Sequence, residues 1–120
     1  MNLNEIVKAL NLKVLCGAGK LDTEVVGGYV GDLLSDVMAH SKEGDVWITR
    51  QIHQNIVAVA SLKDHAAIVL VQGNEPTSET LEKAEQENIP ILLSNRPSFE
   101  TIGAIYDLLK TKGGDSGSKC

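Results

Sequence analysis

Aromatic residues and basic charge are both scarce in this chain, and each shortage excludes a class of partner. Aromatic side chains make up 3% of the 120 residues, whereas a platform for single-stranded nucleic acid needs exposed rings on which bases stack. The formal net charge of −5 disfavours nucleic acid and an anionic membrane surface alike. We therefore expect neither nucleic-acid binding nor membrane binding.

Long apolar runs and cysteines are few as well. No apolar run approaches the roughly 18 residues of a transmembrane helix. The first residues form an amphipathic pattern with Glu5 inside it, unlike the continuous apolar core of a signal peptide. Cys16 and Cys120 are too few for a disulfide framework, and we expect two reduced thiols. These features predict a cytoplasmic protein.

What the chain does contain is an aliphatic core and a regular alternation of elements. The apolar fraction is 42%, and the length suits one domain. Short β-rich runs alternate with helical periodicity over residues 45–110, and Ala66–Val71 is nearly continuous in apolar residues. This order implies parallel strands joined by right-handed crossovers, covered on both faces. We predict an α/β fold: one three-layer domain (residues 1–110) with a mostly parallel sheet of about five strands, and a disordered tail (111–120).

Local signals position the individual elements. Asn2 or Asn4 suits the cap of a first helix, and Thr77 or Ser78 suits the cap of a later one that ends at Asn88. Further expectations are a strand at 13–16, an extended stretch at 25–26 interrupted by Gly27-Gly28, a short helix capped by Asp32, a strand at 46–49, a helix at 51–62, a strand at 91–93 and a last helix from Ser98 to Lys110.

Three pieces of the chain resemble a known family. Residues 27–38 (GGYVGDLLSDVM), 56–61 with 67–76, and 84–93 with 98–109 are similar to a DRTGG domain, and the resemblance spans about Lys13 to Leu109. The family's Thr-Gly-Gly turn corresponds to Val71-Gln72-Gly73, which keeps the second glycine, and its Asp-Arg pair lies nearest to Thr49-Arg50 or to residues 51–53. The resemblance implies a fold like the N-terminal domains of HPr kinase/phosphorylase and of MurF-type muramyl ligases, and a regulatory or dimerising role without catalysis.

Recognisable catalytic and metal-binding patterns do not emerge. Residues 16–20 (CGAGK) resemble a phosphate loop only superficially, because the lysine precedes Leu21-Asp22 instead of a hydroxyl residue opening a helix. His40, His53 and His65 fall in different elements without ligand spacing. The serines suit helix caps or solvent-facing positions. We therefore expect a protein that is not an enzyme, with no metal and no cofactor.

Polar residues follow three strands that we expect to be neighbours in the sheet. The carboxyl ends of parallel strands meet at one edge, where helix N-termini direct their free N–H groups. His53 is expected to open the helix that follows Arg50. This arrangement predicts a site for a small anionic ligand, either a nucleotide or a phosphorylated metabolite. Its predicted residues are Arg50, His53, Gln72, Gly73, Asn74, Asn95 and Arg96.

The segment 27–38 offers more apolar surface than one short helix can bury, and its glycines permit close backbone approach in a twofold dimer. The predicted interface comprises Gly28, Val30, Leu33, Leu34 and Val37. The sequence thus favours a non-catalytic regulatory homodimer that senses an anionic ligand and signals to a partner protein. The alternative is a constitutive protein-interaction adaptor with no small ligand.

Overall fold

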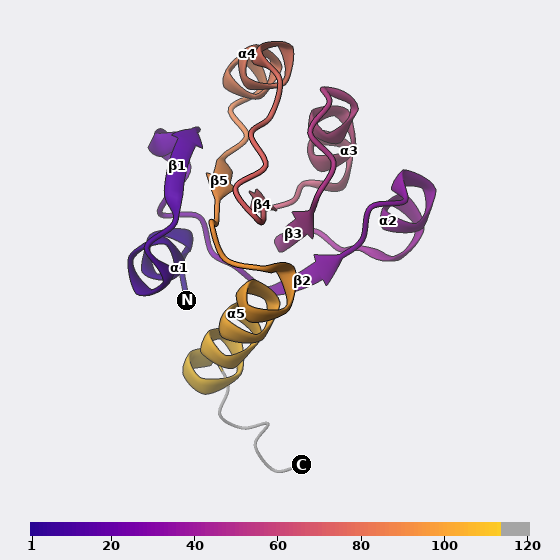
Figure 1. Ribbon diagram of the computed structural model, residues 1–120. Helices are drawn as coiled ribbons and strands as arrows, with labels where there is room; N and C mark the ends of the chain where they lie inside the picture. The colour runs from indigo at the N-terminus through magenta and orange to yellow at the C-terminus, as the bar shows by residue number, and fades with distance from the viewer. Residues whose placement is uncertain (114–120) are drawn as a thin grey trace.

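A five-stranded sheet separates two layers of helices in the computed structural model, which describes residues 1–113 (Figure 1). The strand order is β1-β5-β4-β3-β2; β2 to β5 run parallel, and β1 pairs with β5 in the antiparallel sense. In chain order the elements are α1 (Leu3–Leu10), β1 (Lys13–Cys16), a 3-10 turn η1 (Ala18–Lys20), β2 (Gly27–Val30), α2 (Leu34–His40), β3 (Asp45–Thr49), α3 (Asn55–Lys63), β4 (Ala67–Leu70), α4 (Ser78–Glu87), β5 (Ile91–Leu93) and α5 (Ser98–Gly113). The predicted three-layer α/β fold with a mostly parallel sheet is confirmed.

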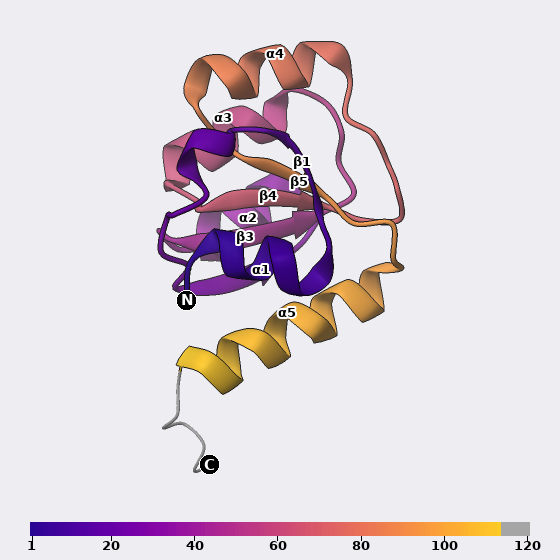
Figure 2. The ribbon, with the colours of Figure 1, turned by 90° about the vertical axis from the view of Figure 1, so that its left-hand side faces the viewer.

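The strands supply two hydrophobic cores, because successive side chains point to opposite faces. Val46, Ile48 and Val69 pack with α1 and α5 on one face, and Trp47 and Ile68 pack with α2, α3 and α4 on the other. Figure 2 shows α5 below the sheet and α3 and α4 above it. Every residue of β3 and β4 is buried, as the continuous apolar pattern predicted.

The predicted helix caps are largely confirmed. Asn2 and Glu5 form a reciprocal capping box at the start of α1. The Thr77 hydroxyl accepts a hydrogen bond from the backbone N–H of Thr80 at the start of α4. Asn88 ends the same helix in the left-handed region at φ 61°. These caps fix where the chain enters and leaves the helical layer.

Two expectations about the region around β2 are wrong. Gly27 and Gly28 do not interrupt a strand; they begin β2, paired with Asp45 and Val46 of β3. Asp32 does not cap α2, because Leu33 occupies the N-cap position and makes no side-chain cap. The Asp32 carboxylate instead accepts hydrogen bonds from Thr49 and Arg50 at the end of β3.

Two helix boundaries also differ from the prediction. Helix α3 begins at Asn55 instead of Gln51, so His53 lies in the preceding loop and does not open a helix. Helix α5 continues to Gly113, past the predicted domain boundary at Lys110. Residues 114–120 of the predicted tail lie outside the described residues.

Candidate ligand site at the carboxyl edge of the sheet

The three polar strand ends lie at one edge, because β3, β4 and β5 are consecutive in the sheet. Backbone pairing continues beyond the strands: Gln72 N–H donates to the carbonyl of Arg96 at 3.0 Å, and Gly73 N–H donates to that of Ser94 at 2.9 Å. The predicted juxtaposition of these loops is therefore present. We call this the carboxyl edge.

A hollow of about 490 Å³ opens between these loops. Arg50, Gln72 and Asn74, three of the predicted site residues, line it. The arginine brings a guanidinium, and the other two bring amide groups that both donate and accept hydrogen bonds. This donor set suits a phosphate or carboxylate group. The remaining lining residues, which the sequence interpretation did not assign to the site, are Asp32, Gln51 and Ile52.

Asp32 is the organising residue of the hollow. Its Oδ1 accepts from Thr49 Oγ1 and from the backbone N–H of Arg50, both at 2.8 Å. Gln51 Nε2 donates to the Asp32 carbonyl at 2.9 Å. Asp32 Oδ2 lies 3.9 Å from Arg50 Nε, an ion pair longer than a hydrogen bond. The carboxylate thus ties the β2–α2 connection to the end of β3 and partly neutralises Arg50.

Gln72 adopts a backbone conformation that its side chain disfavours. Its φ is 60°, and Gly73 follows at φ 67°, in a turn closed by Asn74 N–H to the carbonyl of Val71. Positive φ at both central residues is the pattern of a type I′ turn. The other non-glycine residues with positive φ among those described are Asn or Asp at the ends of helices. Strain of this kind, about 1–2 kcal/mol, is typical of functional sites.

The other predicted ligand residues lie nearby but do not line the hollow. His53 is exposed in the loop before α3. Gly73 backs onto Asn95, since a Cβ added to the glycine would lie 3.2 Å from Asn95 Oδ1. Arg96 is exposed, and its backbone N–H donates to Ser94 Oγ. These four residues remain candidates for the rim of the site.

Three of the five predicted dimer contacts are exposed. Gly28 is exposed, Val30 and Leu33 are 48% and 68% exposed, and Leu34 is half-buried. Val37 is fully buried against Trp47 and α3 in the core, so it cannot contribute to an interface without unfolding α2. Its inclusion in the predicted interface is wrong, because only the outer face of this short helix is free.

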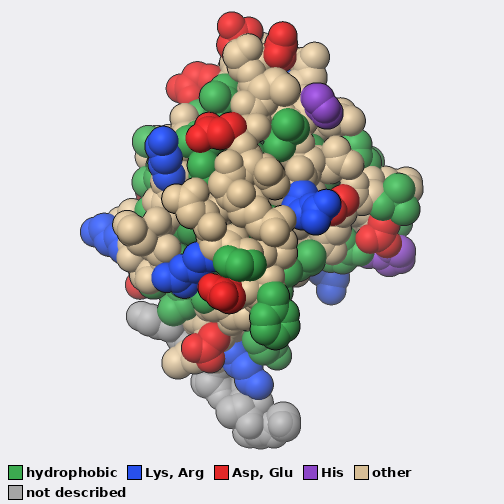
Figure 3. All heavy atoms as spheres, in the orientation of Figure 1, with side chains coloured by type: hydrophobic (Ala, Val, Ile, Leu, Met, Phe, Trp, Pro, Cys, Tyr) green, Lys and Arg blue, Asp and Glu red, His purple; other side chains and the backbone are tan. Residues whose placement is uncertain are grey.

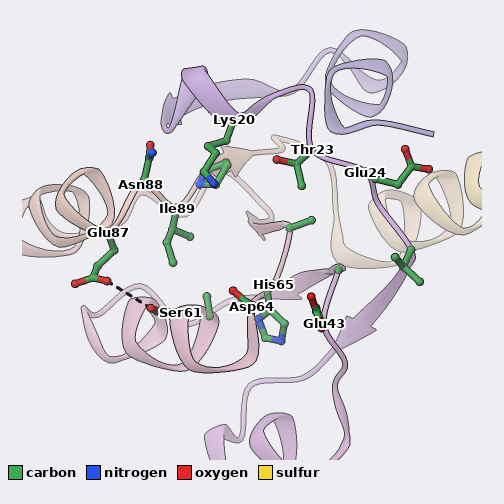
Figure 4. A pocket seen from close by; sticks show the side chains of 15 residues that line it. Lys20, Thr23, Glu24, Glu43, Ser61, Asp64, His65, Glu87, Asn88 and Ile89 are labelled. Carbon is green, nitrogen blue, oxygen red and sulfur yellow. Dashed lines mark hydrogen bonds between the residues drawn. The ribbon is translucent and has the colours of Figure 1, made fainter.

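A larger cavity, about 650 Å³, lies at the opposite, amino edge of the parallel strands (Figure 4). Figure 4 shows Lys20, Thr23 and Glu24 facing Ser61 and Asp64 across it. Helices α3 and α4 end here, so the partial negative charges of their C-termini point toward it. Its acidic lining residues are Glu24, Glu43, Asp64 and Glu87, against the single lysine. This edge is electrostatically unsuited to an anion.

His65 lies beneath the amino edge and is 8% exposed. Ser41 Oγ donates to the carbonyl of Val37, so the 2.8 Å contact between Ser41 Oγ and His65 Nε2 places the ring proton on Nε2. His65 Nδ1 is left without a partner. Burial lowers the pKa of His65; Lys63 lowers it further and Asp45 opposes the shift. The ring is therefore a neutral structural group that holds the end of α2.

Burial also perturbs the thiol of Cys16. Cys16 is half-buried, its Sγ lies 3.5 Å from the carbonyl of Ile89, and burial raises the pKa of the thiol. Within residues 1–113 no three His, Cys, Asp or Glu side chains cluster as metal ligands do. No helix in this part of the chain combines the length and apolarity needed to cross a membrane.

Comparison with known proteins agrees with this architecture. Over 88% of its length, the chain superposes on the CBS and DRTGG domains of the regulatory region of Clostridium perfringens pyrophosphatase, crystallised with its activator diadenosine tetraphosphate. The TM-score is 0.66 at 19% sequence identity, and the chain spans 46% of that structure. Comparison with curated proteins gives no match. The DRTGG domain model matches residues 5–108, and the chain belongs to the DRTGG domain family.

Proposed function

We propose that this chain is a non-catalytic regulatory domain that binds a small phosphorylated ligand at the carboxyl edge. The observation that carries the proposal is the hollow that Arg50 and a strained Gln72 both line. A strained residue persists only where its surroundings or its function retain it. The strained Gln72 lines the same hollow as the cationic Arg50, and hydrogen-bonding groups together with a cation are the chemistry of an anion site.

The charges of the helix termini also favour an anion at the carboxyl edge. Helices α3, α4 and α5 all begin on the carboxyl side of the sheet, and helix starts carry partial positive charge. Arg50 and Arg96 add two cations in a chain with a net charge of −5. The pyrophosphatase regulatory region that shares this fold was crystallised with a nucleotide activator, which supports a ligand of this class.

The contacts of Asp32 couple the candidate ligand site to the exposed connection between β2 and α2. An anion bound to Arg50 competes with Asp32 for the guanidinium, and Asp32 anchors the connection between β2 and α2. The exposed Val30 and Leu33 flank Asp32 on that connection. Ligand binding would therefore shift apolar groups that a second copy or a partner protein contacts. We propose Gly28, Val30, Leu33 and Leu34 as the contact residues of a homodimer.

Ligand binding is tested by thermal unfolding against nucleotides, sugar phosphates and acyl phosphates. A ligand at a hundred times its dissociation constant adds about 2.7 kcal/mol, a rise on the order of ten degrees for a domain of this size. We expect Arg50→Gln to weaken the binding of any hit at least about tenfold, because a charge-assisted hydrogen bond is lost. Lys20→Gln, the same loss of charge at the amino edge, is the matched control. Equal affinity in both variants would contradict the proposed site.

Dimer formation is tested by sedimentation of the wild type and of two lysine variants. Leu33→Lys should dissociate the dimer. Leu62→Lys changes an equally exposed leucine on α3, 71% against 68%, and should leave it intact. A wild-type monomer across the micromolar range rules out the homodimer.

The second candidate function is a constitutive protein-interaction adaptor. The observation in its favour is the exposed apolar surface of α5, where Phe99 is 88% exposed and Tyr106 is 64% exposed. In the space-filling view, hydrophobic side chains emerge beside charged ones over this helix (Figure 3). A ligand panel without a hit would favour this function and direct the search to protein partners.

A further inference from the structure

A second hollow adjoins the candidate ligand site, beneath the first turn of α5. It measures about 240 Å³, half the volume of the first, and Asp32 and Arg50 line both. Its walls, however, are mainly aliphatic. Ile48 and Val71 form part of the lining from the ends of β3 and β4, and Val30 and Ile102 contribute from β2 and α5. Thr49 and Ser98 are its hydroxyl-bearing residues.

The two hollows thus present different chemistry on either side of one shared pair of residues. The polar hollow holds the amides of Gln51, Gln72 and Asn74, whereas the second hollow offers an apolar surface. A phosphate bound to Arg50 and the amides would leave the apolar surface uncovered. A ligand that satisfies both hollows therefore has an anionic end, an apolar end and a connection that passes Asp32.

Asp32 has one oxygen available for that connection. Its Oδ1 already accepts two hydrogen bonds, from Thr49 Oγ1 and from Arg50 N–H. Its Oδ2 has only the 3.9 Å contact with Arg50 Nε, and the side chain is half exposed. A carboxylate oxygen in this position can accept hydrogen bonds from hydroxyl groups, which is how a carboxylate recognises a ribose at the edge of an α/β sheet.

We propose that the ligand of this domain is a nucleoside monophosphate whose parts divide between the two hollows. The base occupies the apolar hollow against Ile102, the ribose hydroxyls donate to Asp32 Oδ2, and the phosphate binds Arg50, Gln72 and Asn74. This assignment rests on the proposed function and adds the ligand class and its orientation. A sugar phosphate or an acyl phosphate would fill the polar hollow alone.

The first test varies the ligand and leaves the protein unchanged, so it does not depend on any variant folding. Isothermal titration of the wild type compares adenosine 5′-monophosphate with ribose 5-phosphate, adenosine and the 2′,3′-dideoxy nucleotide. We expect the nucleotide to bind at least tenfold more tightly than ribose 5-phosphate, which lacks the base. The dideoxy nucleotide should lose about tenfold, because its sugar cannot donate to Asp32.

The second test varies the protein at positions that separate the two hollows. Ile102 is half-buried, so Ile102→Phe should fill the apolar hollow without unfolding the domain. We expect this variant to lose nucleotide binding and to keep ribose 5-phosphate binding. Asp32→Asn should reduce the difference between the ribo- and dideoxy nucleotides. Ile102→Val, which leaves the hollow open, is the matched control.

Failure of this inference is distinguishable from failure of the proposed function. The nucleotide assignment is overturned if the nucleotide and ribose 5-phosphate bind with equal affinity, Ile102→Phe leaves that affinity unchanged and Arg50→Gln still lowers it. That result leaves a sensor of a sugar phosphate or of phosphate. Nucleotide affinity that Arg50→Gln does not change, or no binding of any phosphorylated compound, overturns both.

Discussion

At the amino edge of the parallel sheet helices α3 and α4 end, and at the carboxyl edge they begin. The larger cavity, about 650 Å³, is at the amino edge, where four carboxylates face one lysine. The smaller hollow, about 490 Å³, is at the carboxyl edge, where Arg50, one carboxylate (Asp32) and three amide side chains form most of the lining. Cavity size therefore favours a ligand site at the amino edge, whereas chemistry favours an anion site at the carboxyl edge. At the amino edge the helix C-termini and the side chains are both negative, whereas at the carboxyl edge the helix starts are positive and Asp32 offsets only the charge of Arg50, so chemistry is the better guide to an anionic ligand.

The two edges also differ in how tightly the backbone is packed. At the amino edge, a Cβ on Gly17 would lie 2.4 Å from Pro90 Cα, and one on Gly44 would lie 2.6 Å from Val26 Cγ2. At the carboxyl edge, a Cβ on Gly73 would meet only the side-chain oxygen of Asn95, at 3.2 Å. Gly17 and Gly44 are thus tightly enclosed, by the backbone of Pro90 and the side chain of Val26, whereas Gly73 faces a side chain that can adjust.

The largest expected effect comes from adding a methyl group at each edge. Gly17→Ala combines a left-handed backbone (φ 79°) with overlap against Pro90, and should destabilise by roughly 3 kcal/mol or more. Gly73→Ala has a similar φ of 67° but a movable neighbour, and should cost about 1–2 kcal/mol. Urea unfolding of both variants measures the difference. Equal losses would show that the carboxyl edge is as rigid as the amino edge.

The architecture could be predicted from sequence because its signals are local. Continuous apolar runs predicted β3 and β4, and Thr77 and Asn88 predicted the bounds of α4. Periodicity reports which face of an element is buried, and the order of elements then restricts the topology. The misplaced start of α3 at Gln51 has a local cause too: Gln51 and Ile52 continue the polar and apolar pattern of the helix without belonging to it.

The candidate site was only half predictable, because its central contact joins residues far apart in the chain. Arg50, Gln72 and Asn74 were found from their position after strands. Asp32 was missed because an aspartate before an apolar helix is a common cap, and because Gly27-Gly28 appeared to break the strand that positions it. Its true partners, Thr49 and Arg50, become visible only once β2 is placed beside β3. The strain at Gln72 leaves no sequence signal except the missing glycine of the family's turn.

A smaller expected effect is a difference between the two edges in how they make the folding stability depend on pH. His65 supports the amino edge, whereas no histidine lines the carboxyl hollow. Burial holds the pKa of His65 below its ordinary value of 6.5, so the unfolded chain binds this proton first. Stability should therefore fall as the pH drops below about 6.5 and level off below the folded-state pKa. Denaturant unfolding between pH 4.5 and 7.5, in steps of roughly half a unit, measures the slope.

The matched variants for this slope are His65→Gln, which keeps a donor for Ser41, and His40→Gln, which changes an exposed histidine of α2. His65→Gln should flatten the slope below about pH 6.5, and His40→Gln should not. A wild-type slope retained in His65→Gln would assign the acid response to other groups and remove this distinction between the edges.

The smallest expected effect lies away from both edges, at the contact between β2 and α2. The Tyr29 hydroxyl donates to Asp36, and His40 contacts the same carboxylate at 3.0 Å. The hydrogen bond from Tyr29 lowers the pKa of Asp36, with His40 adding to the shift. A lowered carboxyl pKa gives stability that is present above the unfolded value, about 3.9, and is lost as the pH falls through the folded value.

Tyr29→Phe should therefore reduce the stability of the fold slightly at neutral pH and by less at pH 2.5. Ligand binding should be unchanged, because neither hollow is lined by Tyr29. A loss of ligand affinity in Tyr29→Phe would instead show that the β2–α2 connection is coupled to the carboxyl edge more strongly than the contacts of Asp32 alone imply.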